Sequence, residues 1–222
     1  MNWKVFRRLA LAGCLAMLAP GAFAQATDAL LKELQQQKQT SSHLHMAFWL
    51  PPEFFAATMP ADAAPSTARK FQQMLDGYVL FLVADADIGA MGALTPKIRA
   101  DLLGRTRLSI DGGTPLGTLA DSDLRGDLKA LVSTLKPLFK SMLGNWGEAF
   151  EPIVFKLPAN GPTAGSMVMR DGRIVLVLGD ETFAWRTPLG SLLPPKFDPE
   201  TNEPFPGNYL YSPFTGRKLT TR

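Results

Sequence analysis

The chain has 222 residues, with 23 basic and 20 acidic side chains, a net charge of +3 and a single cysteine. Three of the basic residues and the cysteine lie within the first 24 residues, so the remaining 198 carry 20 basic and 20 acidic side chains and no thiol. This balance argues against nucleic-acid binding through charge, and the missing thiols exclude disulfides and cysteine-ligated metal from that part of the chain. A chain of this length can stabilise one domain by apolar burial alone.

The first 24 residues have the pattern of an export signal. Basic residues precede an apolar run from Leu9 to Leu18, and Ala22-Phe23-Ala24 is a small-x-small cleavage pattern. We therefore expect a protein that is periplasmic or secreted after cleavage near Ala24. The residues before Cys14 also match a lipobox, and a lipoprotein anchored at Cys14 is the alternative. No segment is long and apolar enough to predict a transmembrane span.

The first third of the chain predicts short helices around one strand. Residues 27–39 place leucines on one side of a helix, and residues 42–50 form a strand that Pro51-Pro52 ends. The second proline opens a short helix, because proline is tolerated in a helix's first turn. Residues 60–66 predict a linker, and residues 66–76 predict a helix.

The middle of the chain contains the clearest strand and the clearest helix. Residues 78–84 are all apolar, without alternation, which predicts a strand buried on both faces. A cap and a first-turn proline predict a helix over residues 96–103, and alternation predicts a half-buried strand over residues 105–111. Leucines at spacings of four, three and four predict a helix over residues 122–136, which Pro137 kinks or ends.

The last part of the domain predicts strands. Residues 152–157 form one candidate, and residues 166–185 predict a meander with turns at Asp171-Gly172 and at residues 179–181. Early helices followed by late antiparallel strands favour an α+β fold, an antiparallel sheet with packed helices and a short C-terminal hairpin. The expected organisation is a signal at residues 1–24, a globular domain at residues 25–195 and a tail at residues 196–222.

The tail contains a repeated skeleton. Residues 198–202 and 212–216 both read x-Pro-x-Thr-x, 14 residues apart. They resemble the two knuckles of a zinc ribbon whose four thiolates are replaced, by Asp198, Thr201, Ser212 and Thr215. The resemblance implies a folded ribbon-like hairpin without metal, because one carboxylate and three hydroxyls suit zinc poorly. The alternative is a pair of ordinary proline-bearing turns. The whole pattern also looks like uncharacterised exported bacterial proteins with such a tail, and this resemblance carries no activity.

His43 and His45 are the only histidines in the chain. On a strand, residues two apart share a face, so both imidazoles can meet one metal ion. A catalytic zinc site usually takes three protein ligands, and no acidic residue close in sequence supplies the third. We therefore expect polar histidines on the outer face of a strand, with no metal or other cofactor.

Asp85 and Asp87 directly follow the apolar run of residues 78–84. This arrangement resembles the first motif of haloacid-dehalogenase-like phosphohydrolases, and Gly179-Asp180 after a later apolar run resembles that family's magnesium-binding motif. The resemblance implies a nucleophile at Asp85, a general acid at Asp87 and a metal ligand at Asp180. Together with the two histidines, Asp180 completes the alternative set of metal ligands.

Aromatic residues form two clusters that can line a ligand groove. The first surrounds Pro51-Pro52, and the second lies in the tail. The candidate ligand-binding residues are Phe48, Trp49, Phe54 and Phe55, together with Tyr209 and Tyr211. Packing of loops against the sheet is the other explanation for both clusters.

These patterns predict an exported cell-envelope protein that binds an envelope protein or a small ligand and does not catalyse a reaction. The alternative is a metal-dependent phosphohydrolase centred on Asp85 and Asp87. Topology separates the two. Parallel strands beside residues 78–84 favour the enzyme, whereas an antiparallel meander with Asp180 at an exposed turn argues against it.

Overall fold

The computed structural model describes residues 22–58 and 64–222. The expected export signal lies outside the described residues except for residues 22–24, and Cys14 lies outside them, as do residues 60–63 of the expected linker. Within the described parts of the chain, no helix combines the length and the apolar character needed to cross a membrane.

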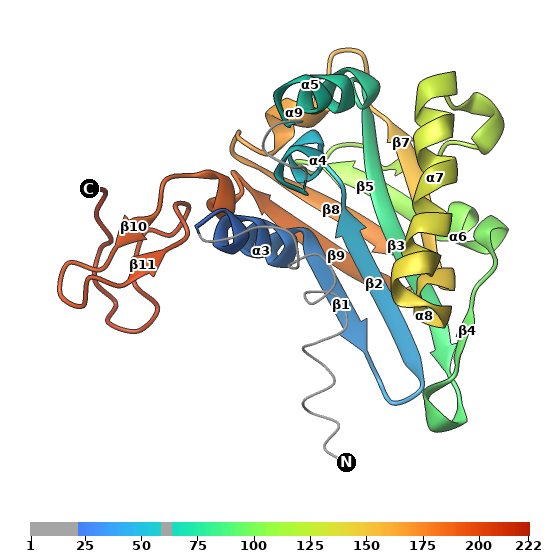
Figure 1. Ribbon diagram of the computed structural model, residues 1–222, viewed down its shortest axis with the longest axis horizontal. Helices are drawn as coiled ribbons and strands as arrows, with labels where there is room; N and C mark the ends of the chain where they lie inside the picture. Colours follow the sequence, from blue (N-terminus) through green and yellow to red (C-terminus); the bar gives the residue numbers. More distant parts are fainter. Residues whose placement is uncertain (1–21, 59–63) are drawn as a thin grey trace.

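The described chain folds into two main antiparallel sheets with helices (Figure 1). The helices are α3 (Ala22–Leu34), α4 (Pro52–Thr58), α5 (Ala64–Met74), α6 (Arg99–Arg105), α7 (Gly126–Leu143), α8 (Asn145–Glu148) and α9 (Ala164–Met167). Sheet A contains β1 (Gln35–Gln39), β2 (His43–Trp49), β3 (Tyr78–Ile88), β4 (Leu94–Pro96) and β7 (Phe150–Lys156). Sheet B contains β6 (Leu116–Gly117), β5 (Thr106–Ile110), β8 (Gly172–Leu178) and β9 (Glu181–Thr187). A hairpin of β10 (Lys196–Phe197) and β11 (Pro204–Phe205) lies in the tail.

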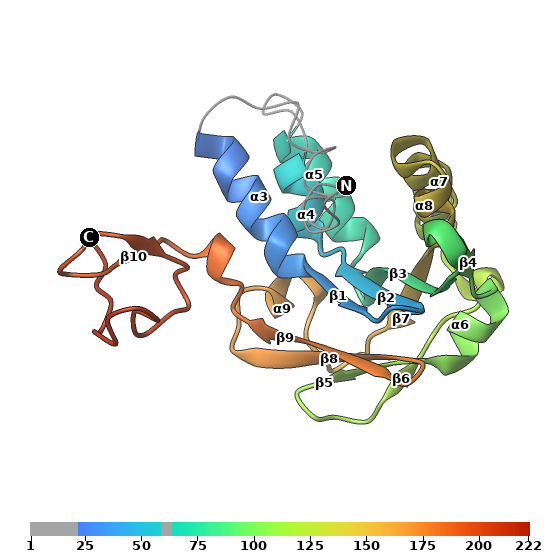
Figure 2. The ribbon, with the colours of Figure 1, turned by 90° about the horizontal axis from the view of Figure 1, so that it is seen from below.

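The elements form three layers (Figure 2). Helices α3, α4, α5, α7 and α8 cover one face of sheet A, and sheet B covers the other face. The predicted α+β class, with an antiparallel sheet and packed helices, is confirmed. The prediction that residues 78–84 are buried on both faces is also confirmed, because β3 lies in the middle layer and its residues 79–86 are buried.

Side-chain alternation assigns the two faces of β2 and β3 to different layers. Phe48 points to the helices and contacts Phe54 of α4, with ring centroids 5.2 Å apart. Phe81 lies on the opposite face and contacts Trp185 of β9, with ring centroids 5.3 Å apart. Successive residues of a strand point to opposite faces, so every second residue of β2 and β3 faces sheet B.

The two sheets are joined along both sides. On one side, Thr118, the residue after β6 of sheet B, forms an isolated β-bridge with Phe155 of β7 in sheet A. On the other side, the Gln36 side chain of β1 donates to the Ala184 carbonyl of β9 at 2.6 Å and accepts from the Ala184 amide at 3.2 Å. The glutamine side chain thus provides hydrogen-bond partners for the backbone amide and carbonyl of Ala184 on the edge strand β9, where unpaired backbone groups would be costly.

Several sequence-based predictions of local structure were wrong. Residues 35–39 leave the expected helix and form β1, because pairing with β2 outweighs their weak strand preference. Pro96 lies in the short strand β4, and the helix starts only at Arg99. Residues 166–170 include the end of α9 and no strand, since the Thr163 hydroxyl caps that helix by accepting from the Ser166 amide.

Helix α7 continues through Pro137 to Leu143, beyond the predicted end. Leu128 and Leu135 of its apolar seam are buried and Leu131 packs partly against the core, as expected, whereas Leu124 is buried in the extended segment before the helix, which starts at Gly126 and not at residue 122. Burial of this seam against the domain offsets the one backbone hydrogen bond that proline removes. Packing of the whole helix therefore decides where it ends.

Replacing Phe81 with alanine is expected to lower the free energy of unfolding by about 3–5 kcal/mol, because a cavity replaces a fully buried ring between the sheets. Denaturant unfolding followed by tryptophan fluorescence measures the change. Phe214→Ala is the matched control, since this ring is 77% exposed and its loss should cost within about 0.5 kcal/mol. Equal effects of the two substitutions would contradict the packing of sheet A on sheet B.

Candidate metal centre

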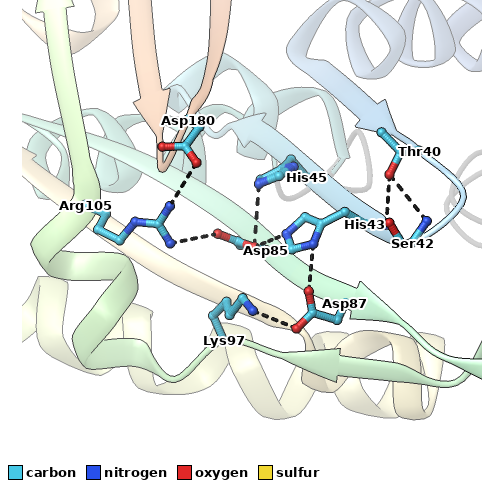
Figure 3. A network of polar contacts seen from close by, with 9 residues as sticks. All are labelled: Thr40, Ser42, His43, His45, Asp85, Asp87, Lys97, Arg105 and Asp180. Carbon is cyan, nitrogen blue, oxygen red and sulfur yellow. Dashed lines mark hydrogen bonds and ion pairs between the residues drawn. The ribbon is translucent and has the colours of Figure 1, made fainter.

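The register of β2 and β3 brings two histidines beside two aspartates. His43 lies opposite Asp87, and His45 lies opposite Asp85. All four side chains lie on the face of sheet A that also carries Phe81 and therefore faces sheet B. Figure 3 shows the four side chains together at one end of the space between the sheets.

The carboxylate of Asp85 is the centre of this cluster. Its side chain is only 2% exposed. Oδ1 lies 2.9 Å from Nε2 of His43 and 3.6 Å from Nε2 of His45. Oδ2 faces sheet B, 4.0 Å from Nη1 of Arg105. A buried carboxylate needs such partners, because burial without them is costly.

His43 connects the buried aspartate to an exposed one. Its Nδ1 lies 2.7 Å from Asp87, whose other oxygen accepts from Nζ of Lys97 at 2.6 Å. Carboxylates only accept, so both histidine contacts are hydrogen bonds only when both ring nitrogens carry a proton. The Lys97 hydrogen bond lowers the pKa of Asp87, and the same bond raises the pKa of Lys97.

His45 is the more buried of the two imidazoles, with 15% of its side chain exposed. Desolvation lowers the pKa of His45 below its ordinary value near 6.5, and the attraction of Asp85 partly opposes this effect. A lowered pKa keeps the ring neutral near pH 7. Neutral imidazole is the form that binds metal ions.

Sheet B covers the cluster with the β8–β9 turn. Gly179 has a φ of +61°, and a Cβ there would come within 2.6 Å of Nη2 of Arg105. The glycine therefore leaves room for the guanidinium beside Asp85. Asp180 follows in the same turn, 3.7 Å from Arg105, and its side chain is 99% exposed.

Three of these residues have the chemistry and spacing of metal ligands. One ligand atom from each of His43, His45 and Asp85 lies within 4.8 Å of the others. A tetrahedral zinc ion, with bonds of about 2.0–2.1 Å, holds its ligand atoms about 3.3 Å apart. The 3.6 Å separation between Asp85 and His45 is close to that value, and the 2.9 Å separation between Asp85 and His43 is that of a hydrogen bond, which an ion would have to replace. Asp87 lies where an outer carboxylate commonly orients a metal-binding histidine.

The sequence predicted both histidines on one face of a strand, and the structure has them there. The expectation that this is an outer face without metal ligands was wrong for the face, because sheet B covers it, and the alternative set of ligands took Asp180 as its third member. The structure instead brings Asp85 to the histidines and leaves Asp180 exposed beside Arg105. The pairing of β2 with β3, which brings Asp85 beside the histidines, was not predicted. A useful signal was present, since His-x-His begins one strand and Asp-x-Asp ends another.

The topology does not support the phosphohydrolase alternative. Asp85 and Asp87 lie inside β3, which pairs antiparallel with β2, β4 and β7. Asp180 lies in the turn of the β8–β9 hairpin. The haloacid-dehalogenase-like resemblance requires parallel strands with helical crossovers, so the roles that it implied for the three aspartates lose their basis.

The aromatic candidates do not form one groove. The four around Pro51-Pro52 are buried in the core and unavailable to a ligand at the surface: Phe48, Trp49, Phe54 and Phe55. Tyr209 and Tyr211 are 43% and 58% exposed, and they lie in the tail. The first cluster therefore stabilises the fold by packing helices α4 and α5 on sheet A.

A surface groove with charged residues lies beside α7. Arg99, Lys136 and Glu151 are among the residues that line it. Arg99 donates to Glu151 at 3.1 Å, and Lys136 also pairs with Glu151. Since its buried carboxylate is already paired with two cations, the groove offers a less reactive set of groups than the histidine–aspartate cluster.

Comparison of the chain with protein-family models, with curated proteins and with solved structures found no match.

A double-mutant cycle is expected to give a coupling of about 1–3 kcal/mol between His43→Gln and Asp85→Asn in the presence of a chelator, because the hydrogen bond involves a buried charge. The measurement is the free energy of unfolding of the wild type, both single variants and the double variant. The matched cycle uses Asp87→Asn, whose side chain is 49% exposed, and should give a smaller coupling because water competes for the carboxylate. A larger coupling with Asp87 would contradict the central position of Asp85.

Proposed function

We propose that the protein binds a divalent transition-metal ion through His43, His45 and Asp85, and that it does so in the cell envelope after export. The observation that carries this proposal is the convergence of three potential ligand atoms within 4.8 Å. Two imidazoles and a carboxylate suit zinc and similar ions of borderline softness. The export signal of the first 24 residues supports the location.

The position of the cluster favours specific binding over an incidental meeting of polar groups. Both strands that carry the ligands are hydrogen-bonded along their length, so their side chains are held in place before an ion arrives. Asp87 accepts from His43, and Lys97 in turn donates to Asp87. Such outer contacts fix the orientation of a metal-binding ring.

The proposal is limited to binding of the ion. Three protein ligands leave one position of a tetrahedral ion open for water or an exchangeable ligand, as in catalytic zinc sites. The groove beside α7 and a second cavity near the β1–β2 turn are lined by residues other than the three ligands. We therefore propose uptake, holding or transfer of an ion as the role of the site.

An ion-pair network without metal is the competing explanation for the same residues. In that case Asp85 only neutralises His43 and Arg105 at the end of the sandwich. Zinc separates the two explanations, because it replaces protons on the imidazoles and stabilises only the folded protein that holds the complete site.

Asp85→Asn is expected to weaken Zn²⁺ binding by more than the roughly 10–100-fold that loss of an outer partner costs, because it removes a direct ligand. Isothermal titration of the purified protein with Zn²⁺ measures the affinity, and the thermal shift caused by Zn²⁺ gives a second readout. Asp180→Asn is the matched control, since it makes the same chemical change at an exposed neighbour and should leave the affinity unchanged. Wild-type protein that binds no zinc, or equal losses in the two variants, would overturn the proposal.

Asp87→Asn is expected to weaken Zn²⁺ binding by about 10–100-fold without abolishing it, because the variant loses the carboxylate that orients His43. The visible spectrum of Co²⁺-loaded protein should keep its tetrahedral form, since the ligands are unchanged. Loss of that spectrum in the Asp87 variant would make Asp87 a ligand, which the proposed set excludes.

A further inference from the structure

The tail repeats one hydrogen-bond pattern twice. In the first turn, the Asp198 carboxylate accepts from the backbone amides of Glu200 at 2.9 Å and Thr201 at 3.3 Å. In the second turn, 14 residues later, the Ser212 hydroxyl accepts from the amides of Phe214 at 3.4 Å and Thr215 at 3.2 Å. The acceptor side chain and both donor amides of the second turn therefore lie 14 residues after their counterparts in the first turn.

The backbone of the two turns repeats as well. The carbonyl of Asp198 accepts from the Asn202 amide at 2.9 Å, and the carbonyl of Ser212 accepts from the Gly216 amide at 2.9 Å. Asn202 and Gly216 both adopt a positive φ, of +61° and +69°. Asparagine and glycine are the residues that tolerate this conformation best.

The second hydroxyl of each turn completes the repeat. Thr201 accepts from the Glu203 amide and Thr215 from the Arg217 amide, both at 3.4 Å. Each turn thus presents two oxygen atoms, three residues apart, that accept from the amides of their own turn. Paired metal ligands in a zinc ribbon have this spacing and this kind of support.

The donor atoms do not fit a zinc ion. One carboxylate and three hydroxyls are poor zinc ligands. In addition, Thr215 Oγ1 donates directly to Asp198 Oδ2 at 2.5 Å, whereas the ligand atoms of tetrahedral zinc lie about 3.3 Å apart. The hydrogen bond thus occupies the place between the turns where an ion would bind.

We infer that residues 196–220 form a ribbon of metal-knuckle type in which the buried carboxylate of Asp198, through its bond to Thr215, joins the two turns in place of a metal ion. The tail consequently folds without metal and does not compete with the histidine site for an ion.

Burial and charge support this role of Asp198. The residue is 1% exposed, and Ser212 beside it is 3% exposed. The hydrogen bond from Thr215, followed by that from the Glu200 amide, lowers the pKa of Asp198 to about 2. The carboxylate is therefore ionised throughout the ordinary pH range, and a charged acceptor strengthens each of its hydrogen bonds. An ion pair between Arg217 and Glu200, at 2.8 Å, also crosses from one turn to the other.

Two matched substitutions test the contact between the turns. In Thr215→Val, the backbone amides of Asn202 and Gly216 should exchange hydrogen at least about tenfold faster, because a hydrogen bond to a charged group is lost. Thr201→Val makes the same change at the equivalent position of the first turn, where the hydroxyl has no bond to Asp198 among the described contacts, and its effect should be smaller. Native-state hydrogen exchange of the full chain measures both, with and without a chelator. Equal effects of the two variants, or loss of tail protection in the wild type with chelator, would overturn the inference.

A four-cysteine variant tests the knuckle geometry itself. Replacing Asp198, Thr201, Ser212 and Thr215 with cysteine should create a site for one additional Zn²⁺ or Co²⁺ ion per chain, with the thiolate absorption bands of tetrahedral Co²⁺. Metal uptake by the wild type, measured in parallel, tests only the histidine site, and the additional uptake by the variant tests only the tail. Either proposal can therefore be wrong without the other. If hydrogen exchange shows a folded body and the variant takes up no additional metal, the two turns are not metal knuckles.

Discussion

Antiparallel pairing of β2 with β3 positions both the core layers and the histidine–aspartate cluster. These strands form the middle of sheet A, and both of their faces are covered, one by helices and the other by sheet B. Because side chains alternate, the same pairing supplies Phe48 to the helix layer and Phe81 to the layer between the sheets. Where the apolar residues of both strands give way to polar ones, it also aligns His45 with Asp85.

Burial changes the chemistry of this polar end. Asp85 is almost fully enclosed and must share its charge with His43, His45 and Arg105. Such a network is expensive to maintain for stability alone, since well-packed apolar residues often serve as well. A metal ion would use the same carboxylate and would take the lone pairs of both imidazoles in place of protons.

In the tail, a buried carboxylate joins two turns through hydrogen bonds. A hairpin of this size has little apolar core, and small modules commonly need a metal or a disulfide. Here the buried Asp198 accepts from backbone amides of its own turn and from Thr215 of the other turn. A single charged acceptor thus links two turns that carry no cysteine. Within the described chain, the histidine cluster offers donors that suit a metal ion, whereas the two turns of the tail are joined by a hydrogen bond.

The α+β class, the strand over residues 78–84, the apolar seam of α7 and the paired pattern in the tail could all be predicted from the sequence. These features depend on local periodicity, which is written into neighbouring residues. Only the folded chain shows that residues 35–39 form a strand and that Asp85, not Asp180, lies beside the two histidines. Those outcomes depend on which strands pair and in what register, and long-range pairing leaves little trace in the local sequence.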